Sequence, residues 1–366
     1  MSLKDKKILV AGAGKSGIGS VNLLLKTGAT VALTDGKTDL DQDALFKKID
    51  QGKKIPLILG EVKEEEADAF DLLVLSPGIS VNAPIADLFA KKGKPVWSEI
   101  ELAYQAGKGK IAAITGTNGK TTTTALTGEI LKGYYTDTFV VGNIGTPYTS
   151  VALETTDESR IVAEISSFQL ETIVDFCPDV CAVLNITPDH LDRHGTVEVY
   201  AKTKESIGKN QGTDQVMVLN YEDDTTRKMA QRAKGKVVFF SLHHQIEEGV
   251  CMAGNEFVIE EDGKKISVCT LEDTCLLGDH NYENILAAIA VSYHMGVPVE
   301  YIKEGIRRFK GVAHRIEYVD TVNGVAYYND SKGTNPDAAI KGIQAMNRPT
   351  YLIGGGYDKK AAYDEW

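Results

Sequence analysis

Residues 114–122, ITGTNGKTT, combine two glycines, hydroxyl side chains and a lysine in a spacing that could hold phosphate. An apolar run at 110–114 precedes them and a helical pattern follows. A glycine-bracketed turn at a helix N-terminus attracts anions, Lys120 adds a full charge, and the Thr121 hydroxyl suits a phosphate-bound Mg²⁺. The general phosphate-loop pattern has glycine where this chain has Ile114, so a polar turn before a helix is the alternative. A lysine in a first helical turn opposes the helix dipole, which favours the phosphate loop.

Three other polar residues follow strand or helix patterns in the same region. Glu164 ends the apolar run 160–164, where a buried charge is costly unless it is paired or metal-bound, so we expect a Mg²⁺-linked role. His190 lies in the polar segment 185–194, which is either a site or a surface loop that caps the next helix. Lys204 falls on the inward stripe of that helix, where a lysine is more often an ion-pair partner than a functional group.

The N-terminal part carries a second phosphate-binding signature. The sequence GAGKSG at 12–17 follows an apolar run at 7–11, and Asp35 ends the next strand pattern, as in a dinucleotide-binding fingerprint. This pattern admits NAD or a UDP-sugar, and the alternative is a tight turn without a ligand. The loop 76–79 follows another strand, 71–75, at the edge where such sheets bind ligands. A nicotinamide oxidoreductase is the weaker hypothesis, because no dehydrogenase catalytic centre follows.

These residues require an α/β scaffold to position them. We predict a Rossmann-like domain over 1–98, a central, mostly parallel α/β domain of the P-loop ATPase type over 99–311, and the start of a C-terminal Rossmann-like α/β domain over 312–366. Within the central part, 249–276 predicts an antiparallel flap of short strands. In the last part we expect a strand at 350–353, and too few strands for a whole sheet.

The composition restricts the class of protein and its partners. The 366 residues are 43% hydrophobic and 25% charged, and the net charge of −11 argues against a nucleic-acid surface. No apolar run approaches the roughly 20 residues of a membrane span, and the N-terminus is too charged and short for a signal peptide. The 5 cysteines form no C-x-x-C pair. We therefore expect a cytoplasmic protein with reduced thiols, no membrane or nucleic-acid partner, and a monomeric state.

A series of motifs, in order through the whole chain, resembles those of the ATP-dependent Mur ligases. The matching segments are TGTNGKT at 115–121, EISSFQLE at 164–171, NITPDHLD at 185–192, Tyr200 with Lys204, HNYEN at 280–284, His314-Arg315 and NDSK at 329–332. The resemblance implies an ATP-dependent ligase that forms an amide bond through an acyl phosphate in peptidoglycan precursor synthesis. The loop of this family is shorter than the general pattern, which accounts for Ile114.

Within the family, the Rossmann-like start with Asp35, the SPGI loop at 76–79 and GNIG at 142–145 favour the member that adds D-glutamate to UDP-N-acetylmuramoyl-L-alanine. The alternatives are an L-alanine-adding member, or a truncated nucleotide-binding fragment without turnover, because we expect most of the family's third domain to be missing.

The resemblance also implies roles for individual residues. ATP would be held by Gly116, Thr117, Asn118, Gly119, Lys120, Thr121, Thr122, Asn281, Asn284, Arg315 and Asp330. Two Mg²⁺ ions would be held by Thr121, Glu164, His190 and a carbamylated Lys204, and the catalytic residues would be Lys120, Glu164, His190 and Lys204. The uridine substrate would meet Ser16, Asp35, Gly36, Ser76, Pro77, Gly78 and Asn143, and D-glutamate would meet Lys332 and Lys359. Imidazole is an unusual Mg²⁺ ligand, whereas carbamylation converts a repelling cation into an anion.

Overall fold

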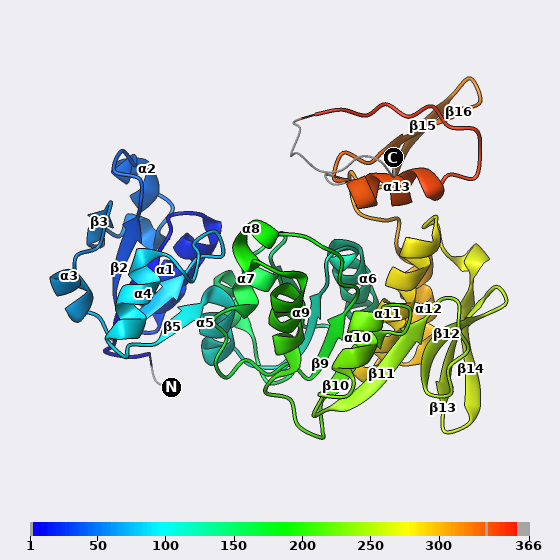
Figure 1. Ribbon diagram of the computed structural model, residues 1–366, viewed down its shortest axis with the longest axis horizontal. Helices are drawn as coiled ribbons and strands as arrows, with labels where there is room; N and C mark the ends of the chain where they lie inside the picture. Colours follow the sequence, from blue (N-terminus) through cyan, green and yellow to red (C-terminus); the bar gives the residue numbers. More distant parts are fainter. Residues whose placement is uncertain (1–2, 334–335, 357–366) are drawn as a thin grey trace. The chain divides into compact units, whose positions relative to one another are not determined.

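The computed structural model describes residues 3–333 and 336–356 (Figure 1). The chain divides into two compact units. The first unit comprises Met1–Thr115, Asp137–Cys181 and Thr187–Gln215. The second unit comprises Gly116–Thr136, Ala182–Ile186 and Val216–Trp366. Among the described residues, no helix has the length and apolar character needed to cross a membrane.

The first unit begins with a parallel five-stranded sheet in the order β3-β2-β1-β4-β5. Its strands are β1 (Lys7–Ala11), β2 (Thr30–Asp35), β3 (Leu57–Leu59), β4 (Leu72–Leu75) and β5 (Val96–Ser98), and its helices are α1 (Lys15–Lys26), α2 (Gln42–Phe46), α3 (Glu64–Asp68) and α4 (Pro84–Lys91). β4 is buried along its whole length, as expected for a central parallel strand. The predicted Rossmann-like sheet is confirmed, and its carboxyl edge carries the glycine-rich turn after β1.

The same unit contains three more parallel strands, β6 (Lys110–Thr115), β7 (Thr138–Gly142) and β8 (Arg160–Glu164), with β8 between the other two. In this register Glu164 lies beside Ile114 on one side and Gly142 on the other. The helices of this region are α5 (Glu99–Ala106), α7 (Ser167–Leu170), α8 (Leu191–His194) and α9 (Val197–Glu205). The strand ends therefore bring Glu164 to one sheet edge, as the sequence predicts.

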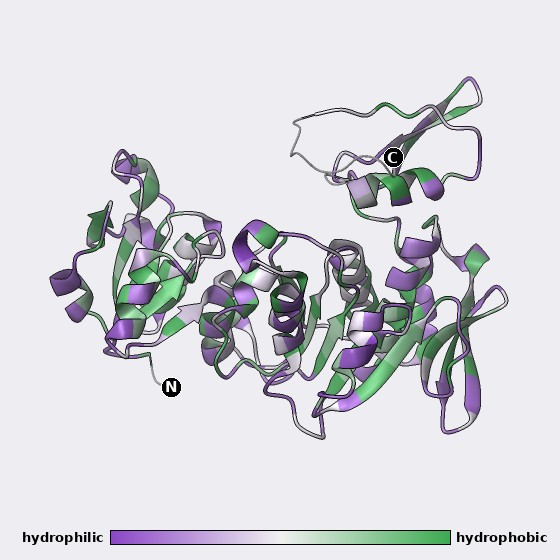
Figure 2. Cartoon of the chain, in the orientation of Figure 1, coloured by the Kyte–Doolittle hydropathy of each residue, from purple (hydrophilic) through white to green (hydrophobic). Residues whose placement is uncertain are grey.

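The second unit is built on strands β10 (Val216–Asn220), β11 (Lys236–Ser241), β12 (Gly249–Ala253), β13 (Glu256–Glu261) and β14 (Lys264–Thr270). β10, β11 and β12 run parallel, whereas β12, β13 and β14 pair antiparallel, which confirms the predicted flap. The helices are α6 (Lys120–Tyr134), α10 (Asp224–Met229), α11 (Asp279–His294) and α12 (Val299–Arg308), and β9 (Val180–Val183) has residues in both units. Figure 2 shows hydrophobic residues concentrated on the strands, which form the core with the buried middle of α11.

The last described part contains an antiparallel hairpin, β15 (Glu317–Val322) and β16 (Val325–Asn329), and helix α13 (Pro336–Gln344). The prediction of a strand at 350–353 is wrong. That segment is irregular, and Tyr351 and Ile353 are each 98% exposed. A strand pattern becomes a strand only where a neighbouring strand accepts its backbone hydrogen bonds, and no described strand lies beside this one.

Candidate active site

The loop between β6 and α6 has a backbone that only glycine can follow at two positions. Gly119 has φ +84°, and a Cβ there would lie 2.2 Å from the side-chain oxygen of Asn284. A Cβ on Gly116, which has φ +149°, would lie 2.9 Å from Leu184. These glycines allow the loop to pack closely against Asn284 and Leu184. The loop ends at the start of α6, the position that a phosphate loop occupies.

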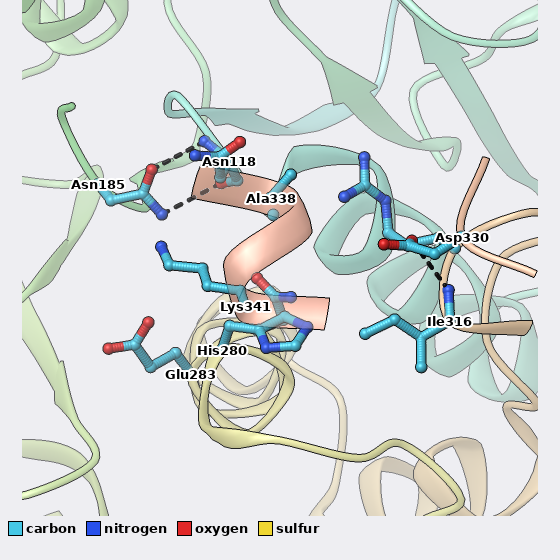
Figure 3. A pocket seen from close by; sticks show the side chains of 11 residues that line it. Asn118, Asn185, His280, Glu283, Ile316, Asp330, Ala338 and Lys341 are labelled. Atoms are coloured by element: carbon cyan, nitrogen blue, oxygen red, sulfur yellow. Dashed lines mark hydrogen bonds between the residues drawn. The ribbon is translucent and has the colours of Figure 1, made fainter. Parts of the chain in front are cut away.

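Asn185 holds this loop through three hydrogen bonds. Its backbone oxygen accepts from Thr117 N at 2.9 Å, its side-chain oxygen accepts from Asn118 N at 2.8 Å, and its amide donates to Asn118 O at 3.2 Å (Figure 3). Lys120 Nζ donates to Gly116 O at 2.9 Å and to Thr117 O at 2.7 Å. The lysine amine thus lies against the loop, where an incoming phosphate would be a stronger acceptor than a carbonyl oxygen.

A pocket adjoins the loop and gathers several of the residues predicted to bind ATP (Figure 3). Its lining consists of Asn118, Gly119, Asn185, His280, Glu283, Asn284, Arg315, Ile316, Asp330, Ala338 and Lys341. Asn284 is fixed in it, since its oxygen accepts from Thr123 Oγ1 at 3.2 Å and its amide donates to Asn281 Oδ1 at 3.3 Å. Asn281, which is also predicted to bind ATP, is thus hydrogen-bonded to Asn284.

The two charged residues predicted for this pocket are both buried in part. Asp330 Oδ1 accepts a hydrogen bond from Ile316 N at 3.1 Å, and burial raises the pKa of Asp330 against the opposing effects of that bond and of Arg315. The Nε atom of Arg315 is buried and has no hydrogen-bond partner among the described residues. A buried guanidinium nitrogen without a partner is suited to an anionic or carbonyl oxygen of a ligand.

Sequence reasoning missed two charged residues of the pocket, Glu283 and Lys341. Burial raises the pKa of Glu283, and the charge of Lys341 opposes that rise. In Figure 3 the amine of Lys341 points to the side of the pocket where Asn185 and Glu283 lie. Glu283 lies inside the motif at 280–284, so the sequence did mark the segment that contains it. Lys341 lies on α13 outside every motif noted in the sequence, so no local pattern marked it as part of a site.

In the first unit, Glu164 and Asn143 form one cluster. Glu164 is 1% exposed, and its Oε1 accepts from Asn143 Nδ2 at 2.9 Å, while Asn143 N donates to Glu164 O at 2.8 Å. Gly142 permits this approach, since a Cβ there would lie 2.1 Å from Glu164 O. Glu164 Oε2 has no hydrogen-bond partner among the described residues. A buried carboxylate oxygen without a partner fits a hard cation such as Mg²⁺.

Lys204 is buried, as its helix periodicity predicts, with 1% of its surface exposed, whereas Lys202 on the same helix is exposed. Its Nζ lies 3.4 Å from Thr115 Oγ1 and 4.7 Å from the ring centroid of Tyr200. Thr115 in turn donates to Ile165 O at 2.7 Å. The lysine amine therefore lies beside the end of β6, in a buried position.

His190 adopts a left-handed backbone, with φ 51° and ψ 34°, at the start of α8. Such a conformation is uncommon for a residue other than glycine, although histidine adopts it more often than most. The ring lies against Phe168 at a centroid distance of 4.9 Å and is partly exposed. The second histidine of the motif, His194, is instead buried against Ser167, with an Nε2–Oγ distance of 3.0 Å, and burial lowers its pKa.

No three histidine, cysteine, aspartate or glutamate side chains converge as a metal site among residues 3–333 and 336–356. A Mg²⁺ site using Glu164 or His190 would therefore need other oxygens. Threonine hydroxyl, lysine carbamate and phosphate oxygens are suitable hard ligands. Glu164 Oε2, which has no partner in the described part of the chain, and the buried Lys204 fit such a mixed ligand set.

The glycine-rich turn after β1 is tightly packed. A Cβ on Gly17 would lie 1.7 Å from Gly12 O, and one on Gly12 would lie 2.8 Å from Ser76 Oγ. Asp35 braces the turn, because its Oδ2 accepts from Ala13 N at 2.9 Å and its Oδ1 accepts from Lys37 N at 3.0 Å. The structure thus brings together the predicted Asp35 and Ser76. Of the other predicted residues, Ser16 is in the first turn of α1, and Gly36, Pro77 and Gly78 follow the ends of β2 and β4.

Of the two lysines predicted to approach the amino acid, the structure describes one. Lys332 is exposed, and its backbone N–H donates to His314 O at 3.0 Å. Lys359 lies outside the described residues.

Comparisons with known proteins identify a family for the N-terminal and the central parts of the chain. A family model described as the Mur ligase MurD-like N-terminal domain matches residues 6–98, and one described as the Mur ligase middle domain matches 114–292. A UDP-N-acetylmuramoylalanine--D-glutamate ligase of Lachnoclostridium phytofermentans is 48% identical over 366 residues, covering 100% of this chain and 81% of the relative. The chain belongs to the Mur ligase family. A ligase of the same name from Lachnospira eligens is 51% identical over 364 residues, with the same coverage.

Solved Mur ligases share the fold at lower identity. The UDP-N-acetylmuramate-alanine ligase MurC of Thermotoga maritima matches with a TM-score of 0.56 and 22% identity, covering 93% of this chain and 77% of that one. The UDP-N-acetylmuramate:L-alanyl-gamma-D-glutamyl-meso-diaminopimelate ligase of Neisseria meningitides matches with a TM-score of 0.57 and 18% identity, covering 84% and 99%. This Mur ligase is an ATP-dependent enzyme of peptidoglycan precursor synthesis, and its family uses Mg²⁺.

Proposed function

We propose that this Mur ligase joins D-glutamate to UDP-N-acetylmuramoyl-L-alanine through an amide bond. The observation that carries the proposal is the match over the whole chain to D-glutamate ligases at 48% and 51% identity. The two phosphate-binding glycine turns support it, since one substrate is a nucleoside diphosphate sugar and the other is ATP. The proposed domains are 1–98 for the uridine substrate, 99–311 for ATP and 312–366 for part of the amino-acid pocket, in a cytoplasmic monomer.

The reaction consists of two displacements. The carboxylate of the muramoyl-alanine substrate attacks the γ-phosphorus of ATP, forms an acyl phosphate and releases ADP. The amine of D-glutamate then attacks the acyl carbon, phosphate leaves, and the amine loses a proton. The first step brings two anions together, so the site must supply positive charge. Lys120 and the N-terminus of α6 supply it at the loop that Asn185 holds in place.

Mg²⁺ would neutralise phosphate charge and orient the γ-phosphate when it is bound. Its proposed ligands are Thr121, Glu164, His190 and Lys204, with two ions and a carbamylated Lys204. The burial of Lys204 beside Thr115 supports the carbamate, because carbamylation removes a costly buried cation. Glu164 Oε2 has no hydrogen-bond partner within residues 3–333 and 336–356, which supports the role of Glu164 as a ligand.

The remaining proposed roles follow the two nucleotide sites. ATP would be bound by the loop 116–122 and by Asn281, Asn284, Arg315 and Asp330. The uridine substrate would be bound by Ser16, Asp35, Gly36, Ser76, Pro77, Gly78 and Asn143. Lys332 and Lys359 would approach D-glutamate.

A phosphate-release assay with ATP, Mg²⁺, UDP-N-acetylmuramoyl-L-alanine and D-glutamate tests the proposal. We expect phosphate release that requires D-glutamate, ATP and UDP-N-acetylmuramoyl-L-alanine. The assay is run on the 366-residue chain and on a chimera in which the relative from Lachnoclostridium phytofermentans supplies the part of its own length outside the matched segment. Release by neither protein contradicts the proposal. Release that requires UDP-N-acetylmuramate and L-alanine instead would favour the L-alanine-adding activity.

A further inference from the structure

Arg193, three residues after His190 on α8, connects segments that are distant in the sequence. Its Nη1 donates to Pro77 O at 3.0 Å and its Nη2 donates to Ile79 O at 3.0 Å. Its Nε donates to Glu171 Oε1 at 3.2 Å, and Nη2 also pairs with Glu171 Oε2. One guanidinium thus bridges a carboxylate and two carbonyl oxygens of the loop after β4.

These contacts are shielded from water. The side chains of Arg193 and Glu171 are 12% and 10% exposed. The guanidinium carbon lies 4.0 Å from the ring centroid of Phe168. Burial strengthens each hydrogen bond of a charged donor, and the ring excludes solvent from one face of the planar group. The arrangement uses the fixed fork of arginine, which a lysine ammonium cannot reproduce.

Other contacts also fix the loop that Arg193 holds, since Ser76 N donates to Ala11 O at 3.0 Å and Ile79 packs against the hydrophobic core. Within it, Ile79 N donates to Ser76 O at 2.9 Å, and Ser76 Oγ makes a long hydrogen bond of 3.4 Å to Gly12 O. Pro77 has no backbone N–H to donate. Two carbonyl oxygens anchored to one guanidinium, on either side of Gly78, restrict the backbone of the residues between them. A side chain from α8 therefore contributes to the conformation of this loop.

We infer that Arg193 is a positioning residue for the uridine-linked substrate. It does not contact the reacting atoms, but it holds the loop 76–79 in the conformation that receives that substrate. The inference rests on the proposed function, which assigns Ser76, Pro77 and Gly78 to the nucleoside diphosphate sugar. A merely structural ion pair would change stability and both Michaelis constants alike, whereas a positioning role changes the affinity for one substrate.

The test compares Arg193→Lys with a matched control, Arg227→Lys. Arg227 also pairs with a carboxylate, Asp224, and lies 5.3 Å from the ring of Tyr221, whose carbonyl oxygen it contacts. Because the lysine side chain in Arg193→Lys would lose at least one charge-assisted hydrogen bond, we expect a KM for UDP-N-acetylmuramoyl-L-alanine that is higher by about tenfold. The KM for ATP should stay within about twofold, and the control should change neither.

Calorimetric binding of UDP-N-acetylmuramoyl-L-alanine and of ATP to the same proteins separates positioning from turnover. We expect weaker binding of the first ligand and unchanged binding of the second. If Arg193→Lys does not fold, Glu171→Gln replaces it, with a smaller effect in the same direction. Equal effects on both ligands, or none on either, overturn the inference. Wild-type protein that binds the uridine ligand but does not use D-glutamate overturns the proposed function instead, and the binding comparison still decides the role of Arg193.

Discussion

The side-chain amide of Asn143 donates to Glu164 Oε1 at 2.9 Å and leaves Glu164 Oε2 buried without a partner among the described residues. The amide fixes the orientation of the carboxylate, and the second oxygen remains available to a ligand. A carboxylate held in this way is costly to the fold, because a buried charge is only partly compensated by one hydrogen bond. Such a cost is typical of a group that is retained for its function.

Glu164→Gln separates the role of this carboxylate in turnover from its effect on stability. We expect turnover to fall by at least about a hundredfold, because the amide cannot bind Mg²⁺ as a carboxylate does. The melting temperature should not fall, because the substitution removes a buried charge and keeps the shape of the side chain. Phosphate release over a range of Mg²⁺ concentrations and thermal unfolding are the measurements. Turnover near the wild-type rate would exclude Glu164 as a metal ligand.

Lys204→Ala should abolish turnover, and high bicarbonate should not restore it, since no amine remains to carry a carbamate. Lys202→Ala is the matched control, because Lys202 lies on the same helix but is exposed. Phosphate release from the two variants is compared at several bicarbonate concentrations. The carbamate hypothesis fails if Lys204→Ala keeps a rate close to that of Lys202→Ala.

Asp35→Asn should raise the KM for the uridine substrate by about tenfold and leave the KM for ATP nearly unchanged. The reason is local, since Asp35 Oδ2 accepts from Ala13 N in the glycine-rich turn, while Oδ1 accepts from Lys37 N after β2. Steady-state kinetics with each substrate varied in turn provide the measurement. Similar changes in both constants would contradict a separate uridine site.

Gly119→Ala should weaken ATP binding by about a hundredfold or more, because its Cβ would lie 2.2 Å from Asn284 Oδ1 in addition to the strain of φ +84°. Gly254→Ala is the control for strain alone, since Gly254 has φ +66° and nothing within 4 Å of the added Cβ. Calorimetry with ATP distinguishes them. Unchanged ATP affinity in Gly119→Ala would show that this loop is not the nucleotide site.

Glu99 predicts a pH dependence of stability. Burial raises its pKa from 4.5 to about 7, opposed by a hydrogen bond from Gln169 at 2.5 Å. The unfolded chain therefore loses this proton at lower pH than the folded chain. Protonated Glu99 therefore stabilises the folded state relative to the unfolded state. This contribution is fully present below pH 4.5 and is lost as the pH rises to about 7.

Glu99→Gln keeps the neutral shape at every pH. Relative to wild type, its free energy of unfolding should increase by about 3 kcal/mol at pH 8 and differ little near pH 4.5. Urea unfolding of both proteins between these pH values is the measurement. Parallel stability curves for the two proteins would show that Glu99 does not titrate in this range.

The features that could be predicted from the residues alone are those that depend on neighbours in the sequence. Glycine spacing at 12–17 and 116–119 marks turns whose backbone excludes side chains, and apolar runs mark the strands that precede them. Helix periodicity places Lys204 inward because residues three and four apart share a face. Motifs at 164–171 and 185–192 mark sheet edges, since ligand-binding residues follow the carboxyl ends of parallel strands.

Contacts between segments that are distant in the sequence could not be predicted from local sequence patterns. The segment 350–353 has a strand-like pattern, but pairing needs a neighbour, which local sequence cannot supply. Lys341 reaches the pocket beside the loop 116–119 only because α13 presents that face to it. Arg193 binds the loop at Pro77 and Ile79 across more than a hundred residues of sequence. Hydrogen bonds of this kind depend on where the chain folds back on itself, so only the three-dimensional arrangement reveals them.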